Sequence, residues 1–188
     1  EYWSKQPSNA ELTTVELGYK ALSLFAVAVY PRPSDLARLS RDRFERLAHG
    51  VRYRYFGTKE LHAVPKFTGQ HGLGFEMQEL VCPASALEAY IDRTADKSVF
   101  FHSDPVYSFE HVFMSQTPAR SGPYKGWYHP VGANTCSRWM KEVMTRAGIK
   151  GYTGGSVRMA AASAAVDNGV PIDEVLRTGR WSSWRVFN

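Results

Sequence analysis

The stretch of this sequence that decides its fold is residues 154–181, which read GGSVRMAAASAAVDNGVPIDEVLRTGRW. Its Ala-rich part, 156–168, predicts a helix, because Ala has the highest helix propensity of all residues. A second short helix is predicted over 171–178, and it leads into a turn that ends at Trp181. Arg158 stands near the start of the first helix, where the helix dipole disfavours a cation. A phosphate bound at the same place would remove that conflict.

The N-terminal part of the chain predicts two helices with a sharp elbow between them. Apolar residues at three-to-four spacing predict a long helix over 11–30. Pro31 and Pro33 break that helix, and Pro33 is well placed to begin a second helix that runs through Leu39. We therefore expect Arg32 in a tight elbow between the two helices.

The middle of the chain predicts a small antiparallel sheet. Alternating apolar and basic residues predict a strand over 51–56, followed by a turn at 57–58 and a return strand over 60–65. The other predicted elements are strands at 75–81 and 111–114, and helices at 83–94, 134–147 and 182–188. The sequence therefore predicts an α+β fold, mostly α, with helices around a small antiparallel three-stranded sheet in a single domain, residues 1–188.

The composition is that of a globular domain with a basic surface. A net charge of +5 and an isoelectric point near 9.3 favour polyanionic partners, although many basic proteins bind no nucleic acid. No apolar run approaches the roughly 20 residues needed to cross a bilayer, so we expect no membrane association. Cys82 and Cys136 are far apart and have no neighbours at metal-ligand spacing. We accordingly expect no metal site at these cysteines.

Several segments resemble the signature boxes of the tyrosine recombinases (the phage integrase-like family). Residues 156–175 resemble the second box, in which an Arg begins a small-residue helix before a Gly-Val-x-Ile-x-Glu-like turn. Residues 178–183, TGRWSS, resemble the family's Gly-His or Gly-Trp turn, in the Trp form of Cre-type recombinases. Residues 32–36, RPSDL, resemble the first box, Arg-x-Ser-Glu-Leu. Lys59 stands where the family carries its catalytic lysine.

The order and spacing of these residues strengthen the resemblance. Lys59 follows Arg32 by 27 residues, Arg158 follows Lys59 by 99, and Trp181 follows Arg158 by 23. The closing segment also resembles recombinases of eukaryotic mobile elements, the DIRS and Crypton types. An origin in such an element would imply transposition or integration in the nucleus, and otherwise the cytoplasm or nucleoid is expected. No localisation signal is visible in the sequence.

The resemblance implies DNA strand cleavage and rejoining through a covalent phosphotyrosyl intermediate, without a cofactor or a metal. Arg32 and Arg158 would hold the backbone phosphate, since a planar guanidinium binds two oxygens and stays charged. Lys59 would protonate the leaving hydroxyl, and Trp181 would pack against the phosphate or donate a hydrogen bond to it. The implied partners are double-stranded DNA and further copies of the chain on that DNA, as a dimer or tetramer.

Two departures from the family pattern leave other functions open. The family usually carries His, sometimes Lys, at the position of Gly155, and its nucleophilic tyrosine would fall about nine or ten residues after Trp181, beyond Asn188. We therefore expect a catalytic domain truncated at its C-terminus, without the family's N-terminal DNA-clamping domain and inactive as it stands. The alternative is a domesticated, catalytically inactive domain that binds nucleic acid or serves as a structural subunit. A type IB topoisomerase, which shares the chemistry, is a weaker third hypothesis.

Overall fold

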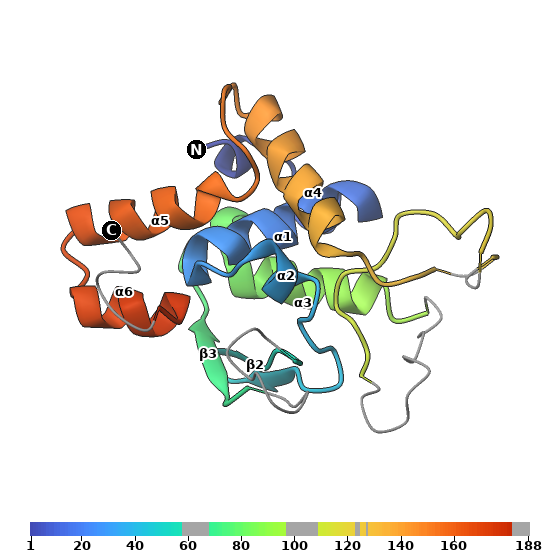
Figure 1. The fold of residues 1–188 in the computed structure, drawn as a ribbon, viewed down its shortest axis with the longest axis horizontal. Coiled ribbons are helices and arrows are strands. Elements are labelled where there is room, and N and C mark those ends of the chain that lie inside the picture. Colours follow the sequence, from blue (N-terminus) through green and yellow to red (C-terminus); the bar gives the residue numbers. More distant parts are fainter. Residues whose placement is uncertain (58–67, 97–108, 123–124, 127, 182–188) are drawn as a thin grey trace.

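A computed structural model describes residues 1–57, 68–96, 109–122, 125–126 and 128–181 of the chain (Figure 1). The α-helices in this part are α1 (Thr14–Val29), α2 (Pro33–Leu36), α3 (Pro83–Arg93), α4 (Ala133–Arg146), α5 (Ser156–Asp167) and α6 (Ile172–Gly179). The strands are β1 (Glu45–Leu47), β2 (Gly50–Tyr53) and β3 (His71–Gly74), and two 3-10 helices are η1 (Trp3–Lys5) and η2 (Glu79–Val81). The predicted fold class, α+β and mostly α around a three-stranded antiparallel sheet, is confirmed.

Helix α1 lies at the centre of the molecule, in contact with α3, α4 and α5 (Figure 1). It begins at a capping box, in which the backbone N–H of Thr13 donates to Glu16 Oε2 at 3.0 Å and that of Glu16 donates to Thr13 Oγ1 at 3.3 Å. Leu17, Leu22 and Phe25 are completely buried along its length. Burying each such side chain is worth about 1.5–3 kcal/mol, so α1 is the element around which the core forms.

The sheet packs beneath the C-terminal half of α1. Its order is β1-β2-β3, with both pairs antiparallel and Val51 opposite Leu73 in the register. The Phe25 ring meets the Tyr53 ring edge to face, with centroids 4.9 Å apart. Aromatic packing of this kind ties the helix to the sheet.

Several predicted strands differ from the structure. The strand expected at 75–81 is wrong, because the third strand is β3, and residues 79–81 form η2 instead. The strand expected at 111–114 is also wrong, because His111 and Met114 form isolated bridges with Ser40 and Pro130. The sequence HGLG of β3 has low strand propensity, since half of it is glycine, and its strand conformation comes from pairing with β2. The return strand at 60–65 and the helix at 182–188 lie outside the described residues.

Helices α5 and α6, with the turn through Trp181, form an arm beside the rest of the molecule (Figure 1). The other helices and the sheet form the body, which has one large cluster of buried apolar side chains. The arm has a much smaller cluster, in which Ala162 and Val175 are buried against Tyr30 at the end of α1. The arm therefore docks on the body where α1 ends.

The described ranges contain neither a membrane-spanning helix nor a cluster of metal-ligating side chains. No helix in them is long and apolar enough to cross a membrane. No group of three or more His, Cys, Asp or Glu side chains in them is arranged to hold a metal ion. Cys82 and Cys136 are both buried free thiols.

Candidate functional site

Arg158 is held between the two ends of the arm. It lies in the first turn of α5 and is only 9% exposed. Its Nη2 donates a hydrogen bond of 2.6 Å to the carbonyl oxygen of Gly179, and its Cζ lies 4.1 Å from the centre of the Trp181 ring. A charged donor and a stacked ring together fix the plane of the guanidinium. The structure thus brings together two of the residues that the sequence singled out.

The turn after α6 explains why a glycine precedes Arg180 and Trp181. The N–H of Trp181 donates to the Leu176 carbonyl at 2.9 Å, and the N–H of Arg180 donates to that of Arg177 at 3.2 Å, which is the Schellman pattern. A Cβ on Gly179 would come within 1.7 Å of the Trp181 ring. Only glycine lets the indole fold back over the end of the helix and lie against Arg158.

Arg32 lies in the elbow that the two prolines predict. Helix α1 ends at Val29, and the residue that caps it, Tyr30, adopts a left-handed conformation with φ 49°. Arg32 then has extended backbone angles, and its N–H donates to Asp35 Oδ2 at 2.9 Å, so that the Asp35 carboxylate caps α2. Asp35 is only 1% exposed. The elbow is confirmed, and a buried carboxylate fixes its backbone.

Arg180 joins the elbow to the turn of the arm. Its guanidinium forms an ion pair with the Asp35 carboxylate and lies 4.6 Å above the centre of the Tyr55 ring. Beside it, the Tyr30 and Trp181 rings pack with centroids 6.4 Å apart. Sequence reasoning missed Arg180. The one local signal was an arginine at the position after a helix where glycine or asparagine is usual.

The chain between β2 and β3 begins and ends beside this site. The N–H of Thr68 donates to the Tyr55 carbonyl at 2.8 Å, and the N–H of Tyr55 donates to Thr68 Oγ1 at 3.1 Å. Lys59, the predicted general acid, falls between these two residues in sequence and lies outside the described residues. Its proximity to the arginines therefore stays a prediction.

Ionisable groups beneath Arg180 are held neutral by their surroundings. Burial raises the pKa of Tyr53 and of Tyr55 well above the usual value for a phenol. Burial, together with the charge of Arg180, lowers the pKa of His71 below its usual value. Near neutral pH the side chains of Tyr53, Tyr55 and His71 are therefore uncharged, and they pack beneath the ion pair of Arg180 with Asp35.

The two glycines before α5 differ in what surrounds them. A Cβ on Gly154 would lie 2.2 Å from the backbone oxygen of Ser137 in α4, so any larger residue there would collide with the body. At Gly155 the only described atom within 4 Å of such a Cβ is Thr153 Oγ1, at 3.8 Å, and the backbone angles are ordinary (φ −71°, ψ −25°). Close packing requires a glycine at Gly154, whereas the described surroundings leave room for a side chain at Gly155.

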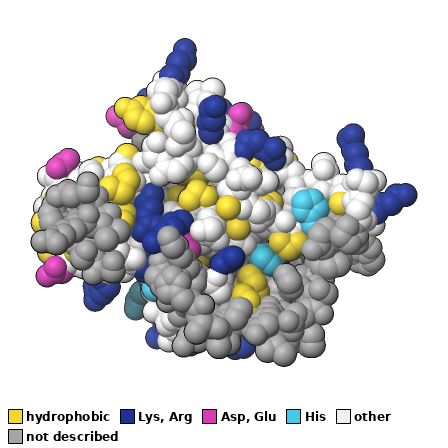
Figure 2. All heavy atoms as spheres, viewed as in Figure 1, with side chains coloured by type: hydrophobic (Ala, Val, Ile, Leu, Met, Phe, Trp, Pro, Cys, Tyr) yellow, Lys and Arg dark blue, Asp and Glu magenta, His cyan; other side chains and the backbone are white. Residues whose placement is uncertain are grey.

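Positive charge gathers around the site, although several arginines elsewhere serve the structure. Figure 2 shows Lys and Arg side chains between the C-terminal end of α1 and the arm. By contrast, Arg41 donates to the carbonyl oxygens of Ile91 and Thr94 at 3.3 and 3.1 Å. Arg146 donates to Glu142 at 2.8 Å. The cations near the arm are the better candidates for phosphate contacts.

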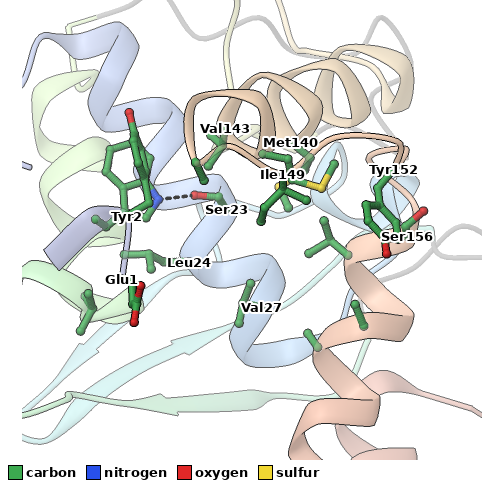
Figure 3. A pocket seen from close by; sticks show the side chains of 17 residues that line it. Glu1, Tyr2, Ser23, Leu24, Val27, Met140, Val143, Ile149, Tyr152 and Ser156 are labelled. Atoms are coloured by element: carbon green, nitrogen blue, oxygen red, sulfur yellow. Dashed lines mark hydrogen bonds between the residues drawn. The ribbon is translucent and has the colours of Figure 1, made fainter. Parts of the chain in front are cut away.

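An apolar pocket lies between α1, α4 and α5, and its lining includes Ser156 and Val157 from the same turn of α5 as Arg158 (Figure 3). It has a volume of about 420 Å³, and side chains such as Val27, Met140 and Ile149 point into it. Neither a lysine nor an arginine of the described chain lines it. The pocket therefore offers apolar contacts, whereas the candidate phosphate contacts come from the arginines.

Comparisons with known proteins establish the fold. No protein-family model matches the sequence, and no curated protein matches it by sequence. Among solved structures, the chain is similar to XerH site-specific recombinase in a post-cleavage complex with palindromic difH substrate, with a TM-score of 0.61 and 11% identity over 99% of this chain and 44% of that chain. XerA recombinase matches with a TM-score of 0.56 and 16% identity over 93% of this chain and 57% of that one. FLP recombinase, in a Holliday junction complex, matches with a TM-score of 0.58 and 15% identity over 94% and 41%.

The chain therefore has the fold of a tyrosine recombinase catalytic domain. It spans 44% of the XerH chain and 57% of the XerA chain, about half the length of these proteins. At 11% and 16% identity the likeness concerns the fold alone.

Proposed function

We propose that this chain is the catalytic domain of a DNA-breaking and rejoining protein, in which Arg32 and Arg158 hold one backbone phosphate. The observation that carries the proposal is the state of Arg158. Arg158 belongs to the first turn of α5, and its guanidinium is oriented by the Gly179 carbonyl, at the C-terminal end of α6, and by the Trp181 ring. A phosphate bound there would favour the same guanidinium orientation, because a planar guanidinium can hold two phosphate oxygens at once.

In the proposed reaction a tyrosine hydroxyl attacks the phosphate, the sugar oxygen leaves, and the reverse attack rejoins the strand. The transition state carries extra negative charge on the non-bridging oxygens, which two preoriented guanidiniums stabilise. Lys59 donates the proton to the leaving oxygen. The resembling family carries its nucleophilic tyrosine after the position of Trp181, and no tyrosine follows Tyr152 in this sequence.

A second candidate function is DNA binding without cleavage. Gly155 favours it, because a glycine side chain supplies neither a general base nor a hydrogen bond to the phosphate where the resembling family carries histidine. The same arginines would then hold DNA but not cut it. In both cases we propose double-stranded DNA as the partner, and self-association on that DNA as in recombination between two sites. An origin in a mobile element is a further part of this proposal.

The experiment that tests the proposal uses the natural full-length protein and nicked DNA duplexes that trap a covalent adduct. Arg158→Ala is expected to reduce adduct formation by about 100-fold or more, as loss of one transition-state donor does elsewhere. Arg158→Lys should recover only part of the loss, because an ammonium cannot bind two oxygens in a plane. Arg177→Ala, which removes an exposed cation from the last turn of α6, is the matched control and should change little.

The outcomes separate the two functions. A covalent adduct that depends on Arg158 supports the enzyme. DNA binding that depends on Arg32 and Arg158 without any adduct supports the binding protein. If Arg32→Ala and Arg158→Ala leave both DNA binding and adduct formation unchanged, the phosphate site itself is wrong.

A further inference from the structure

Arg180 is not among the residues to which the signature boxes give a role in phosphate binding. It nevertheless joins the elbow that holds Arg32 to the turn that orients Arg158. We propose that the ion pair between Asp35 and Arg180 is a brace that sets the position of Arg32 relative to Arg158, which makes Arg180 a positioning residue for phosphate binding. This inference rests on the proposed function, because it assumes that Arg32 and Arg158 bind the same phosphate.

One end of the brace holds the elbow. The Asp35 carboxylate accepts the backbone N–H of Arg32 at 2.9 Å and also pairs with the Arg180 guanidinium. One carboxylate therefore fixes the backbone of Arg32 and receives a cation from the arm. A movement of Arg180 is passed to Arg32 through a single buried group.

The other end of the brace holds the turn. Arg180 stands between Gly179, whose carbonyl accepts from Arg158, and Trp181, whose ring stacks on the same guanidinium. Two residues adjacent to Arg180 thus orient Arg158. Because Arg180 is covalently joined to both, its anchor on Asp35 sets where Arg158 lies relative to the elbow.

The backbone supports this interpretation independently. Among the described residues, the non-glycine residues with positive φ are Tyr30 at 49° and Arg180 at 56°. Tyr30 enters the elbow and Arg180 forms the turn, and their neighbourhoods meet where Tyr30 packs on Trp181. Backbone strain that persists is concentrated where geometry matters for function. Glycine would satisfy the turn more easily, so the arginine is explained by what its side chain does.

The burial of the pair points the same way. The side chains of Arg180 and Asp35 are 13% and 1% exposed. Buried ion pairs add little net stability compared with apolar replacements, and their best-attested use is to specify one arrangement. A pair that specifies the approach of the arm to the elbow fits that use.

The test is a double-mutant cycle on the affinity of the protein for a random-sequence 30-base-pair DNA duplex, measured at several salt concentrations. Arg180→Gln removes the charge, and Arg177→Gln removes an exposed charge from the same helix as the matched control. The pair Asp35→Asn with Arg180→Gln removes both charges and leaves no unpaired buried ion. Arg180→Lys keeps a cation, and Arg180→Gly keeps the left-handed turn without the side chain. Thermal unfolding by circular dichroism shows which variants are folded.

A positioning role predicts coupling. We expect Arg158→Ala to weaken DNA binding about 10-fold and Arg180→Gln to weaken it about 5-fold. The double variant Arg158→Ala/Arg180→Gln should bind about 10-fold more weakly than the unchanged protein, and not 50-fold, because both changes remove the same oriented contact. The Asp35→Asn/Arg180→Gln pair should match Arg180→Gln, Arg180→Lys should recover part of the loss, and Arg177→Gln should stay within 2-fold.

Three results would overturn the brace. The first is that Arg180→Gln binds DNA as tightly as the control Arg177→Gln. If Arg32→Ala and Arg158→Ala still weaken binding in that case, the brace is wrong but the proposed function stands. The second is additive losses with a salt dependence reduced by about one phosphate contact, which makes Arg180 a direct phosphate ligand. The third is full binding by Arg180→Gly. If Arg32→Ala and Arg158→Ala have no effect, the proposed function itself fails, and the two failures are thereby distinguished.

Discussion

The body of the molecule and its arm differ in what holds each of them in place. The body is built on a large cluster of buried apolar side chains around α1, whereas the arm buries few such side chains, chiefly Ala162 and Val175. The arm depends more on directed contacts, namely the Arg158–Gly179 hydrogen bond, the Arg180–Asp35 ion pair and the ring of Trp181. Apolar burial is non-directional, whereas these contacts hold only in one geometry. The candidate site therefore lies in the part of the molecule where directed contacts, more than apolar burial, fix the positions of the side chains.

The largest effect is expected from the body. Phe25→Ala should lower the free energy of unfolding by about 3–5 kcal/mol, because it leaves a cavity between α1 and the sheet. Val27→Ala on the same helix is the control, since Val27 is 51% exposed and should change stability by less than about 0.5 kcal/mol. Urea unfolding measures both. Equal losses for the two variants would show that this cluster does not hold the body together.

An intermediate effect is expected at the joint between body and arm. Gly154→Ala should cost about 1–3 kcal/mol, because its Cβ would overlap the Ser137 backbone oxygen and push α5 from α4. Gly155→His should change stability by less than about 1 kcal/mol, since the described surroundings leave room for it. Urea unfolding and hydrogen exchange of the α5 amides compare the two.

The same pair of variants bears on function. Gly155→His returns an imidazole to the position where the resembling family carries it, and adduct formation by the full-length protein is expected to rise. A Gly155→His protein as unstable as Gly154→Ala would contradict the difference between the two positions.

The smallest effect is a pH dependence beneath the arm. Because burial and Arg180 lower the pKa of His71, folding favours the neutral imidazole. This contribution to stability is fully present above the unfolded pKa of about 6.5 and is lost as the pH falls through the lowered folded value. Replacing His71 with Gln should flatten that part of the profile of unfolding free energy against pH. An unchanged profile in the variant would assign the dependence to other groups.

Local sequence signals predicted part of this molecule well. The proline-bounded elbow at Arg32 and the Ala-rich helix of Arg158 follow from backbone restrictions and propensities that act within a few residues. Strand β3 was missed because its glycines carry no propensity, and only its pairing with β2 makes it a strand. Arg180 was missed because its partner, Asp35, is distant in sequence and meets it only in the folded chain. Lys59 stays a prediction.

The central place of α1 has a consequence for synthesis on the ribosome. Residues 14–29 emerge before their partners in α4, which are complete only at Arg146. At a translation rate of about 5–20 residues per second, roughly 6–23 s pass between the synthesis of α1 and the completion of α4. During this interval the side chains of α1 that pack on α4 lack part of their native cover, so the nascent chain is expected to be a substrate for chaperones. A core built around one helix is therefore complete only after distant parts of the chain have been made.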